Sequence, residues 1–317
     1  MYRPRRDPVW HVAGLLETMA PILAHHLCLS DRWICRKRMN ITSPTHEGHG
    51  EGLSLTAEAT GASDLDAARE QRWNERQLAE PVLQPRMKVW TYREGAIVLG
   101  RSQHALADRP AAAGVGGAPA GDAAGMSPDG LADSGAVNLP LVKRGAGGGA
   151  VLVGPWLLSA SLLLPLDDPR MAATSVADSY RWLGEAMVET LAELGVAARA
   201  VPPAERIPAP ERLAWACFAG VAPWEVVVDD PATGVARKLV GFAQRRSRHG
   251  VLLALGVLVQ PAPWRLLAQT LGHPVALADE LAATTVDLAS VSPRPVSNDD
   301  FLAALWPRLQ PMSLMAD

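Results

Sequence analysis

Cysteine is scarce in this sequence: the 317 residues contain only Cys28, Cys35 and Cys217. So few cysteines, in an odd number, argue against a disulfide-stabilised scaffold and fit a reducing compartment. An excess of charge of one sign is lacking as well. Lys and Arg number 30 and Asp and Glu number 33, which gives a net charge of −3 at pH 7. This balance argues against nucleic acid or an anionic membrane as the main partner.

Long hydrophobic runs are also missing. The most apolar N-terminal stretch, WHVAGLLETMAPILAHHLCL, is interrupted by Glu17, Pro21 and two histidines, whereas a membrane span needs roughly 18 or more apolar residues in a row. No small-residue cleavage site follows a compact apolar core, as a signal peptide would require. We therefore expect a cytoplasmic protein without a membrane partner.

Hydrophobic residues make up 48% of the chain, enough for the core of one large α/β domain or two smaller ones. Two stretches do not fit such a core. Residues 1–62 mix arginine clusters and histidines with a polar stretch, which predicts a disordered extension or a start codon placed too early. Residues 105–136 are dominated by Ala, Gly, Asp and Pro and predict a surface insertion. The folded domain is expected at residues 63–300, followed by a C-terminal tail at residues 301–317.

Hydrophobic spacing predicts helices in three places. The stretch DLDAAREQRWNERQLAE carries apolar residues at helical intervals. The clearest helix, SVADSYRWLGEAMVETLAELGV, places Leu183, Met187 and Leu191 on one face and should end at Gly195. A last helix is expected at residues 264–271.

Strands are predicted mainly around hairpins. MKVWTYREGAIVLGRSQ is expected to form one, with strands at residues 89–90 and 97–99 around a turn at Glu94 and Gly95. Further strands are expected in VNLPLVKR, AVLVGPWLLSASLLLPL, PWEVVVDD and RKLVGFAQRRSRHGVLLALGVLV. Because the regular strand–helix alternation of a doubly wound fold is missing, the predicted fold class is α+β, with a mixed sheet.

The stretch VKRGAGGGAV is the first candidate site. Gly147, Gly148 and Gly149 would let backbone N–H groups approach an anion closely, since no Cβ stands in the way. Arg144 could add a bidentate contact to a carboxylate or phosphate. Neither a phosphate-loop pattern nor a dinucleotide fingerprint is present. The residues alone leave a binding loop and a plain flexible turn equally open.

Lys238 and Cys217 are the other two candidates. Lys238, in ARKLVGFAQRR, suits either a strand-edge lysine that reaches solvent or a cation that holds a developing oxyanion or an acyl phosphate. Cys217, in WACFAGVAPWEV, is either a small buried hydrophobic residue or a nucleophile whose thiolate a nearby cation favours. His249 and His273 have no partners at metal-ligand spacing, so we predict no metal site.

Taken in order, these segments resemble the lipoate–protein ligase A family, which includes lipoate ligases, octanoyltransferases and, more distantly, biotin ligases. WNERQLAE, with Asn74 and Glu75, is similar to the opening helix of the family, and VWTYREGAIVLGRSQ is similar to its Trp hairpin that ends in Gly-Arg-x-Gln. KRGAGGGAV resembles its glycine loop, and RKLVGFAQRR resembles its lysine strand. The resemblance covers residues 64–271 without the insertion.

The resemblance implies a class II aminoacyl-tRNA synthetase/biotin synthetase-like fold, with residues 63–300 as a single catalytic domain. It implies transfer of a lipoyl or octanoyl group to a lysine of a lipoyl-domain protein, with Lys238 at the activated carboxyl group. It further assigns binding of the acyl group or adenylate to Arg144, Gly147, Gly148, Gly149, Ala150, Gly241, Ala243 and Gln244.

Two mechanisms divide the family. In the first, Cys217, which matches the cysteine of the transferases, forms a thioester with an acyl group from an acyl carrier or an acylated lipoyl protein, and no cofactor is needed. In the second, ATP and Mg²⁺ activate the acid as an adenylate. The stretch LVGPW replaces the His-Asp of many ligases after the glycine loop, which favours the transferase. A third hypothesis is a homologue that binds lipoyl proteins without catalysis.

Overall fold

The computed structural model describes residues 65–108, 139–172, 175–310 and 313–315. They belong to one compact unit, Glu58–Asp317. The predicted extension at residues 1–62 lies outside the described residues, as does most of the predicted insertion. Residues 104–107, at the start of that insertion, form a short helix, α3.

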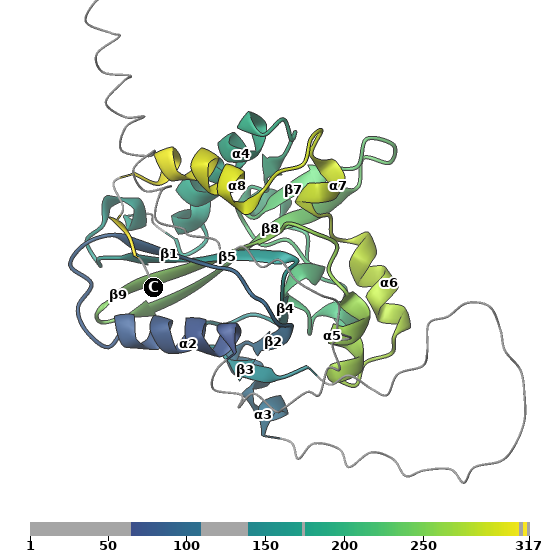
Figure 1. Cartoon of the computed structure of the whole chain (residues 1–317), viewed down its shortest axis with the longest axis horizontal. Coiled ribbons are helices and arrows are strands. Elements are labelled where there is room, and N and C mark those ends of the chain that lie inside the picture. The colour runs from purple at the N-terminus through teal and green to yellow at the C-terminus, as the bar shows by residue number, and fades with distance from the viewer. Residues whose placement is uncertain (1–64, 109–138, 173–174, 311–312, 316–317) are drawn as a thin grey trace, which may run out of the picture. The chain divides into compact units, whose positions relative to one another are not determined.

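A seven-stranded sheet forms the centre of this unit (Figure 1). In spatial order its strands are β10 (Ser313–Leu314), β1 (Arg86–Trp90), β5 (Leu157–Leu164), β9 (Gly250–Leu258), β8 (Ala236–Ser247), β7 (Val226–Asp229) and β6 (Arg199–Ala200). All neighbours are antiparallel except β10 and β1, which are parallel. All eight residues of β5 are buried, as expected of a strand with neighbours on both edges and covered faces. The prediction of an α+β fold with a mixed sheet is confirmed.

A second sheet of three strands stands where the hairpin was predicted. Its order is β3 (Leu141–Lys143), β2 (Ala96–Leu99) and β4 (Val151–Val153). The hairpin prediction is therefore wrong: β1 pairs with β5, whereas β2 pairs with β3 and β4. Both strands are largely buried, so each gains more from a central place in its own sheet than from a two-stranded ribbon.

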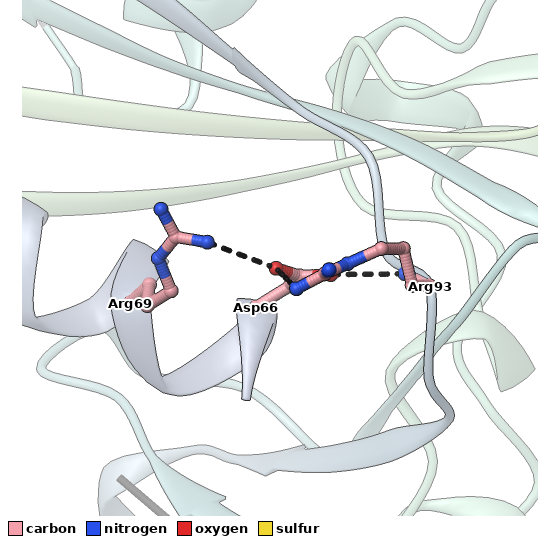
Figure 2. A network of polar contacts seen from close by, with 3 residues as sticks. All are labelled: Asp66, Arg69 and Arg93. Atoms are coloured by element: carbon pink, nitrogen blue, oxygen red, sulfur yellow. Dashed lines mark hydrogen bonds and ion pairs between the residues drawn. The ribbon is translucent and has the colours of Figure 1, made fainter. Parts of the chain in front are cut away.

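The connection between β1 and β2 is held by the first helix, α2 (Asp66–Gln77). The Asp66 carboxylate accepts hydrogen bonds from the backbone N–H of Arg93 at 3.0 Å and from its Nε at 3.1 Å, and Arg69 adds a longer contact at 3.4 Å (Figure 2). Burial raises the pKa of Asp66, but the hydrogen bonds from Arg93 outweigh it, and the pKa lies below its ordinary value. This contact directs the chain out of the large sheet and into the small one.

The other helices cover the large sheet. Figure 1 shows α4 and α8 on one side of it and α2 on the other. The α-helices after α2 are α3 (His104–Ala107), α4 (Arg181–Glu193), α5 (Trp264–Thr270), α6 (Ala276–Ala283), α7 (Leu288–Val291) and α8 (Asn298–Leu305). The 3₁₀ helices are η2 (Arg101–Gln103), η3 (Pro169–Met171), η4 (Asp178–Tyr180), η5 (Pro203–Glu205), η6 (Glu211–Leu213), η7 (Cys217–Ala219) and η8 (Trp306–Leu309). Within the described ranges, no helix combines the length and the apolar character that a membrane crossing requires.

Helix α4 confirms the clearest helical prediction. Leu183, Met187 and Leu191 are fully buried on one face. Gly195 has a φ of +81°, and the N–H of Val196 donates to the carbonyl of Leu191 at 2.8 Å. This is the glycine stop of a Schellman motif, which only a residue that tolerates positive φ forms without strain.

The C-terminal part of the chain differs from the prediction. The helix predicted at residues 264–271 is confirmed as α5 (Trp264–Thr270), but it is not the last one, because three α-helices follow it. Residues 301–317 are not only a tail: Phe301 is fully buried in α8, and Ser313 pairs with Arg86 at the edge of the large sheet. Helices α6, α7 and α8 have eight residues or fewer, too few turns for a hydrophobic period to stand out.

Candidate active site

The glycine loop between β3 and β4 lies directly against the segment that carries Cys217. The N–H of Ala150 donates to the carbonyl of Trp215 at 2.8 Å, and the N–H of Cys217 donates to the carbonyl of Ala150 at 2.9 Å. Gln103, from the Gly-Arg-x-Gln motif, also donates to the carbonyl of Trp215, at 2.9 Å. Three segments that are distant in the sequence therefore meet at the cysteine.

The glycines of this loop allow its close packing. A Cβ on Gly149 would lie 2.7 Å from the carbonyl oxygen of Trp215 and 2.9 Å from the backbone nitrogen of Cys217. Gly148 has a φ of +93°, and a Cβ there would lie 3.8 Å from the Sγ of Cys217. By contrast, a Cβ on Gly147 would meet no atom within 4 Å. Two of the three glycines are thus needed for backbone contact beside the thiol, which a plain flexible turn does not explain.

Arg144 holds the glycine loop from inside. Its side chain is buried, and its Nη2 donates to the carbonyls of Gly147 at 2.8 Å and Gly149 at 2.9 Å. These bonds give the loop a fixed shape next to Cys217. The predicted contact of Arg144 with a carboxyl group of the substrate stays a prediction.

Lys238 lies beneath the cysteine segment and not at its surface. The side chain is 1% exposed. Its Nζ donates to the carbonyls of Cys217 at 3.1 Å and Gly220 at 3.0 Å and forms an ion pair with the Oε2 of Glu225 at 2.7 Å. An ammonium group has three N–H donors, and each has an acceptor here. The interpretation of Lys238 as a strand-edge lysine that reaches solvent is therefore wrong.

Glu225 was not predicted from the sequence, although it joins the main parts of the site. It is 2% exposed. Besides the ion pair with Lys238, its carboxylate accepts hydrogen bonds from the N–H of Ala222 at 2.7 Å and from the N–H of Phe242 at 2.9 Å. Trp224, directly before it, has a φ of 67°, the one positive value at a described residue other than glycine. The available signal in the sequence was that this charged residue stands directly before a run of three valines.

A cavity of about 680 Å³, the open space at its mouth included, opens at Cys217. Its apolar wall includes Val98, Val151, Val153, Leu157, Leu252 and Leu255. Of the predicted binding residues, Arg144, Gly241 and Ala243 also line this cavity. Gly147, Gly148, Gly149 and Ala150 do not line it. Gln244 does not line it either, and its amide donates to the Oγ of Ser179 at 3.1 Å. We call this space the acyl cavity, since its wall suits a hydrocarbon chain.

Two polar residues of α2 face the acyl cavity. Glu70 and Asn74, one turn apart on the helix, are both buried and line the space. Burial raises the pKa of Glu70 to about 7, against the opposing effects of the hydrogen bond from Tyr92 at 2.7 Å and of Arg144. The Oδ1 of Asn74 has no hydrogen-bond partner. Sequence reasoning did not find Glu70, because a glutamate in a helix is usually exposed.

The rim of the acyl cavity is charged. Glu75, next to Asn74 on α2, forms an ion pair with Arg245 of β8, and both residues line the opening. Among the residues that the structure describes, no group of three or more His, Cys, Asp or Glu side chains is placed to hold a metal ion.

Comparison with known proteins gives a consistent family. The family model described as the lipoyl protein ligase A/B catalytic domain matches residues 70–305. The octanoyltransferase LipM of Kyrpidia tusciae is 34% identical over 192 residues, which are 56% of this chain and 66% of that relative, so the match leaves about a third of the relative uncovered.

Two solved structures from Thermoplasma acidophilum share the fold. One is a bipartite lipoate protein ligase with its E2 lipoyl domain, with 16% identity, a TM-score of 0.50 and coverage of 78% of this chain and 80% of that one. The other is a putative lipoate protein ligase with bound lipoic acid, with 17% identity, a TM-score of 0.50 and coverage of 78% and 83%. At these identities the likeness concerns the fold alone.

Proposed function

Because the chain belongs to the lipoyl protein ligase A/B catalytic domain family, we propose that it transfers an octanoyl or lipoyl group to a lysine of a lipoyl domain through a thioester on Cys217. The curated relative is an octanoyltransferase, which supports this choice within the family. The donor would be an acyl thioester on a carrier protein or an acylated lipoyl protein.

One observation carries the proposal: the half-buried Cys217 lies on the wall of the apolar acyl cavity. A chain of eight carbons bound there would be removed from water, and each buried methylene group contributes roughly 0.8 kcal/mol. Its carboxyl end would then lie at the thiol. The nearby backbone of Gly148 leaves room for a carbonyl group beside the sulfur, because no side chain occupies that position.

The reaction consists of two acyl transfers. In the first, the Cys217 thiolate attacks the carbonyl carbon of the donor thioester, and the donor thiol leaves as its thiolate. In the second, the neutral amine of the acceptor lysine attacks the acyl-Cys217 thioester, the C–S bond breaks, and the amide forms. The amine proton leaves with the collapse of the tetrahedral intermediate, so that Cys217 ends as a thiol. A thioester suits both steps, since thiolates are good nucleophiles near neutral pH and thioesters react readily with amines.

Two features of the site support the choice of a thioester over an adenylate. Lys238, the residue that would contact an acyl phosphate, already has three acceptors for its ammonium group and is almost completely buried. Strand β4, after the glycine loop, is apolar, and the Trp156 indole donates back to the carbonyl of Leu152 at 3.2 Å. The proposed reaction therefore contains no nucleotide, and ATP-dependent ligation stays the alternative.

The proposal is tested by reconstituted transfer. Purified protein would be incubated with an apo-lipoyl domain and octanoyl-carrier protein, or with octanoate, ATP and Mg²⁺, and the acceptor mass would be measured. We expect octanoylation from the carrier without ATP, and loss of it in Cys217→Ala. Acylation that requires ATP and survives Cys217→Ala would replace the proposal by ligation, and no acylation under either condition would favour a non-catalytic homologue.

A further inference from the structure

A second hollow meets Cys217 from another direction. It measures about 790 Å³ with its open mouth and lies between residues 206–209 and residues 214–223. Ile207 and Val221 join these two segments by a pair of backbone hydrogen bonds of 3.1 and 2.7 Å. Cys217 and Phe242 line both this hollow and the acyl cavity, so the thiol stands where the two spaces meet.

Acyl transfer through a thioester needs space on two sides of the carbonyl carbon. The carbonyl carbon of an acyl-Cys217 intermediate carries the acyl chain on one side, and the nucleophile has to approach it from another. With the chain in the acyl cavity, the second hollow is the space from which a nucleophile reaches the same carbon. Gly148 and Gly149 line this hollow, and the missing Cβ of Gly148 leaves space beside the Sγ of Cys217.

The lining of the hollow fits a lysine side chain. Its walls include Ile207, Pro208, Val221 and Pro223, apolar surfaces that suit a stem of four methylene groups. The titratable and charged groups that line it are Arg206, Cys217, Glu225 and Lys238. At the inner end, the Glu225 carboxylate is already paired with Lys238 at 2.7 Å. The pair is net neutral, so it offers no free carboxylate to balance an incoming ammonium.

We propose that this hollow, which we call the amine hollow, admits the acceptor lysine to acyl-Cys217; the assignment rests on the proposed thioester function. A lysine has to lose a proton to solvent before it attacks, and its ordinary pKa is about 10.4. Entry into the hollow, away from water, favours the neutral amine, since burial disfavours an ammonium that finds no free carboxylate. By its ion pair with Glu225, Lys238 keeps that carboxylate from stabilising the ammonium.

The pH dependence of the second transfer gives one test. Acyl-enzyme would be prepared with the small donor S-octanoyl-N-acetylcysteamine and mixed with apo-lipoyl domain at increasing pH. The discharge rate should rise with a midpoint well below about 10.4. A wild-type midpoint at the ordinary value would show that the amine is not shielded from water when it attacks, and would overturn the assignment of the hollow.

The decisive test fills the amine hollow. Ala222 is exposed and lines it, so Ala222→Trp would narrow the opening while the backbone bond to Glu225 stays in place. Discharge to the lipoyl domain should slow at least about tenfold, as expected when a reacting group is displaced by an ångström or more. Formation of the thioester and its discharge by hydroxylamine should keep wild-type rates. Val235→Trp, at an exposed position that lines neither space, is the matched control.

The other outcomes are equally informative. Unchanged discharge to the lipoyl domain in Ala222→Trp would overturn the assignment. Equal slowing of thioester formation and discharge would overturn it as a lysine site and make the hollow a common entrance for donor and acceptor. If wild-type protein forms no thioester at all, the proposed function fails, and this assignment fails with it.

Discussion

The Nζ of Lys238 lies 2.7 Å from the Oε2 of Glu225, and the two side chains are 1% and 3% exposed. The same ammonium binds the carbonyls of Cys217 and Gly220, while the same carboxylate binds the N–H of Ala222. A single buried ion pair therefore fixes both ends of the segment that carries the proposed nucleophile. Removal of either partner would leave a buried charge without compensation.

Glu225→Gln should destabilise the fold by about 3–5 kcal/mol, the cost typical of breaking a buried ion pair from one side. Urea unfolding followed by circular dichroism measures this. Glu185→Gln, which removes an exposed partner of Arg181, is the control and should have a much smaller effect, since exposed ion pairs contribute little to stability. If both substitutions lowered the free energy of unfolding by the same small amount, the buried ion pair would not stabilise the fold.

The double variant Glu225→Gln/Lys238→Met separates stability from positioning. Without either charge, the protein should recover much of the lost stability, because uncharged side chains often replace a buried pair without a large penalty. The rate of octanoyl transfer should remain low, since the carbonyls of Cys217 and Gly220 lose their common donor. Recovery of both stability and the transfer rate would contradict the positioning role.

Gly149→Ala should disturb the site where Gly147→Ala does not. The new Cβ at position 149 would press on the backbone of Trp215 and Cys217, which cannot yield as a flexible side chain can, whereas position 147 is open. We expect the transfer rate of Gly149→Ala to fall by about tenfold or more, from displacement of the nucleophile. Rates of Cys217 alkylation by iodoacetamide would report the same displacement. Equal rates in the two variants would contradict the packing role of Gly149.

Glu70→Gln should change how stability depends on pH. The pKa of Glu70 in the folded protein is raised by burial from 4.5 to about 7, so the folded state holds its proton more tightly than the unfolded state. The associated stability is present below pH 4.5 and is lost as the pH rises through 7. Above pH 7 the free energy of unfolding is lower than at acidic pH by roughly 3 kcal/mol from this group.

Urea unfolding at pH 5 and pH 8 tests this sign. Relative to wild type, Glu70→Gln should gain stability at pH 8 and little at pH 5, because its side chain cannot ionise. Glu80→Gln, at an exposed position, should leave the wild-type pH dependence unchanged. A Glu70→Gln variant with the wild-type pH dependence would show that Glu70 does not ionise in this range.

Local patterns in the sequence predicted the local parts of the fold. Helix α4 was predicted together with its stop at Gly195, because helical spacing and a glycine end are properties of neighbouring residues. The prediction of a hairpin between β1 and β2 was wrong, since the pairing of a strand depends on partners that are distant in the chain. The helices after α5 were missed because each is short.

Only part of the site was predicted, because its motifs are local whereas its contacts join residues that are distant in the chain. Cys217 and Lys238 stand in recognisable motifs, and the structure brings them together with the glycine loop. Lys238 donates to the backbone carbonyl of Cys217 and pairs with the Glu225 carboxylate. The spacing of residues in the sequence reveals neither contact. Gln244 was placed in the site by its motif, but its side chain bonds to Ser179 on another element.

The central claim is that Cys217 carries the acyl group between donor and acceptor. Intact-mass spectrometry after brief incubation with octanoyl-carrier protein, without acceptor, tests it most directly. The account predicts a mass increase of one octanoyl group that hydroxylamine removes, that Cys217→Ala abolishes, and that the double variant Cys28→Ser/Cys35→Ser retains. An unmodified wild-type protein that nevertheless acylates the lipoyl domain, or an adduct that persists in Cys217→Ala, would contradict it.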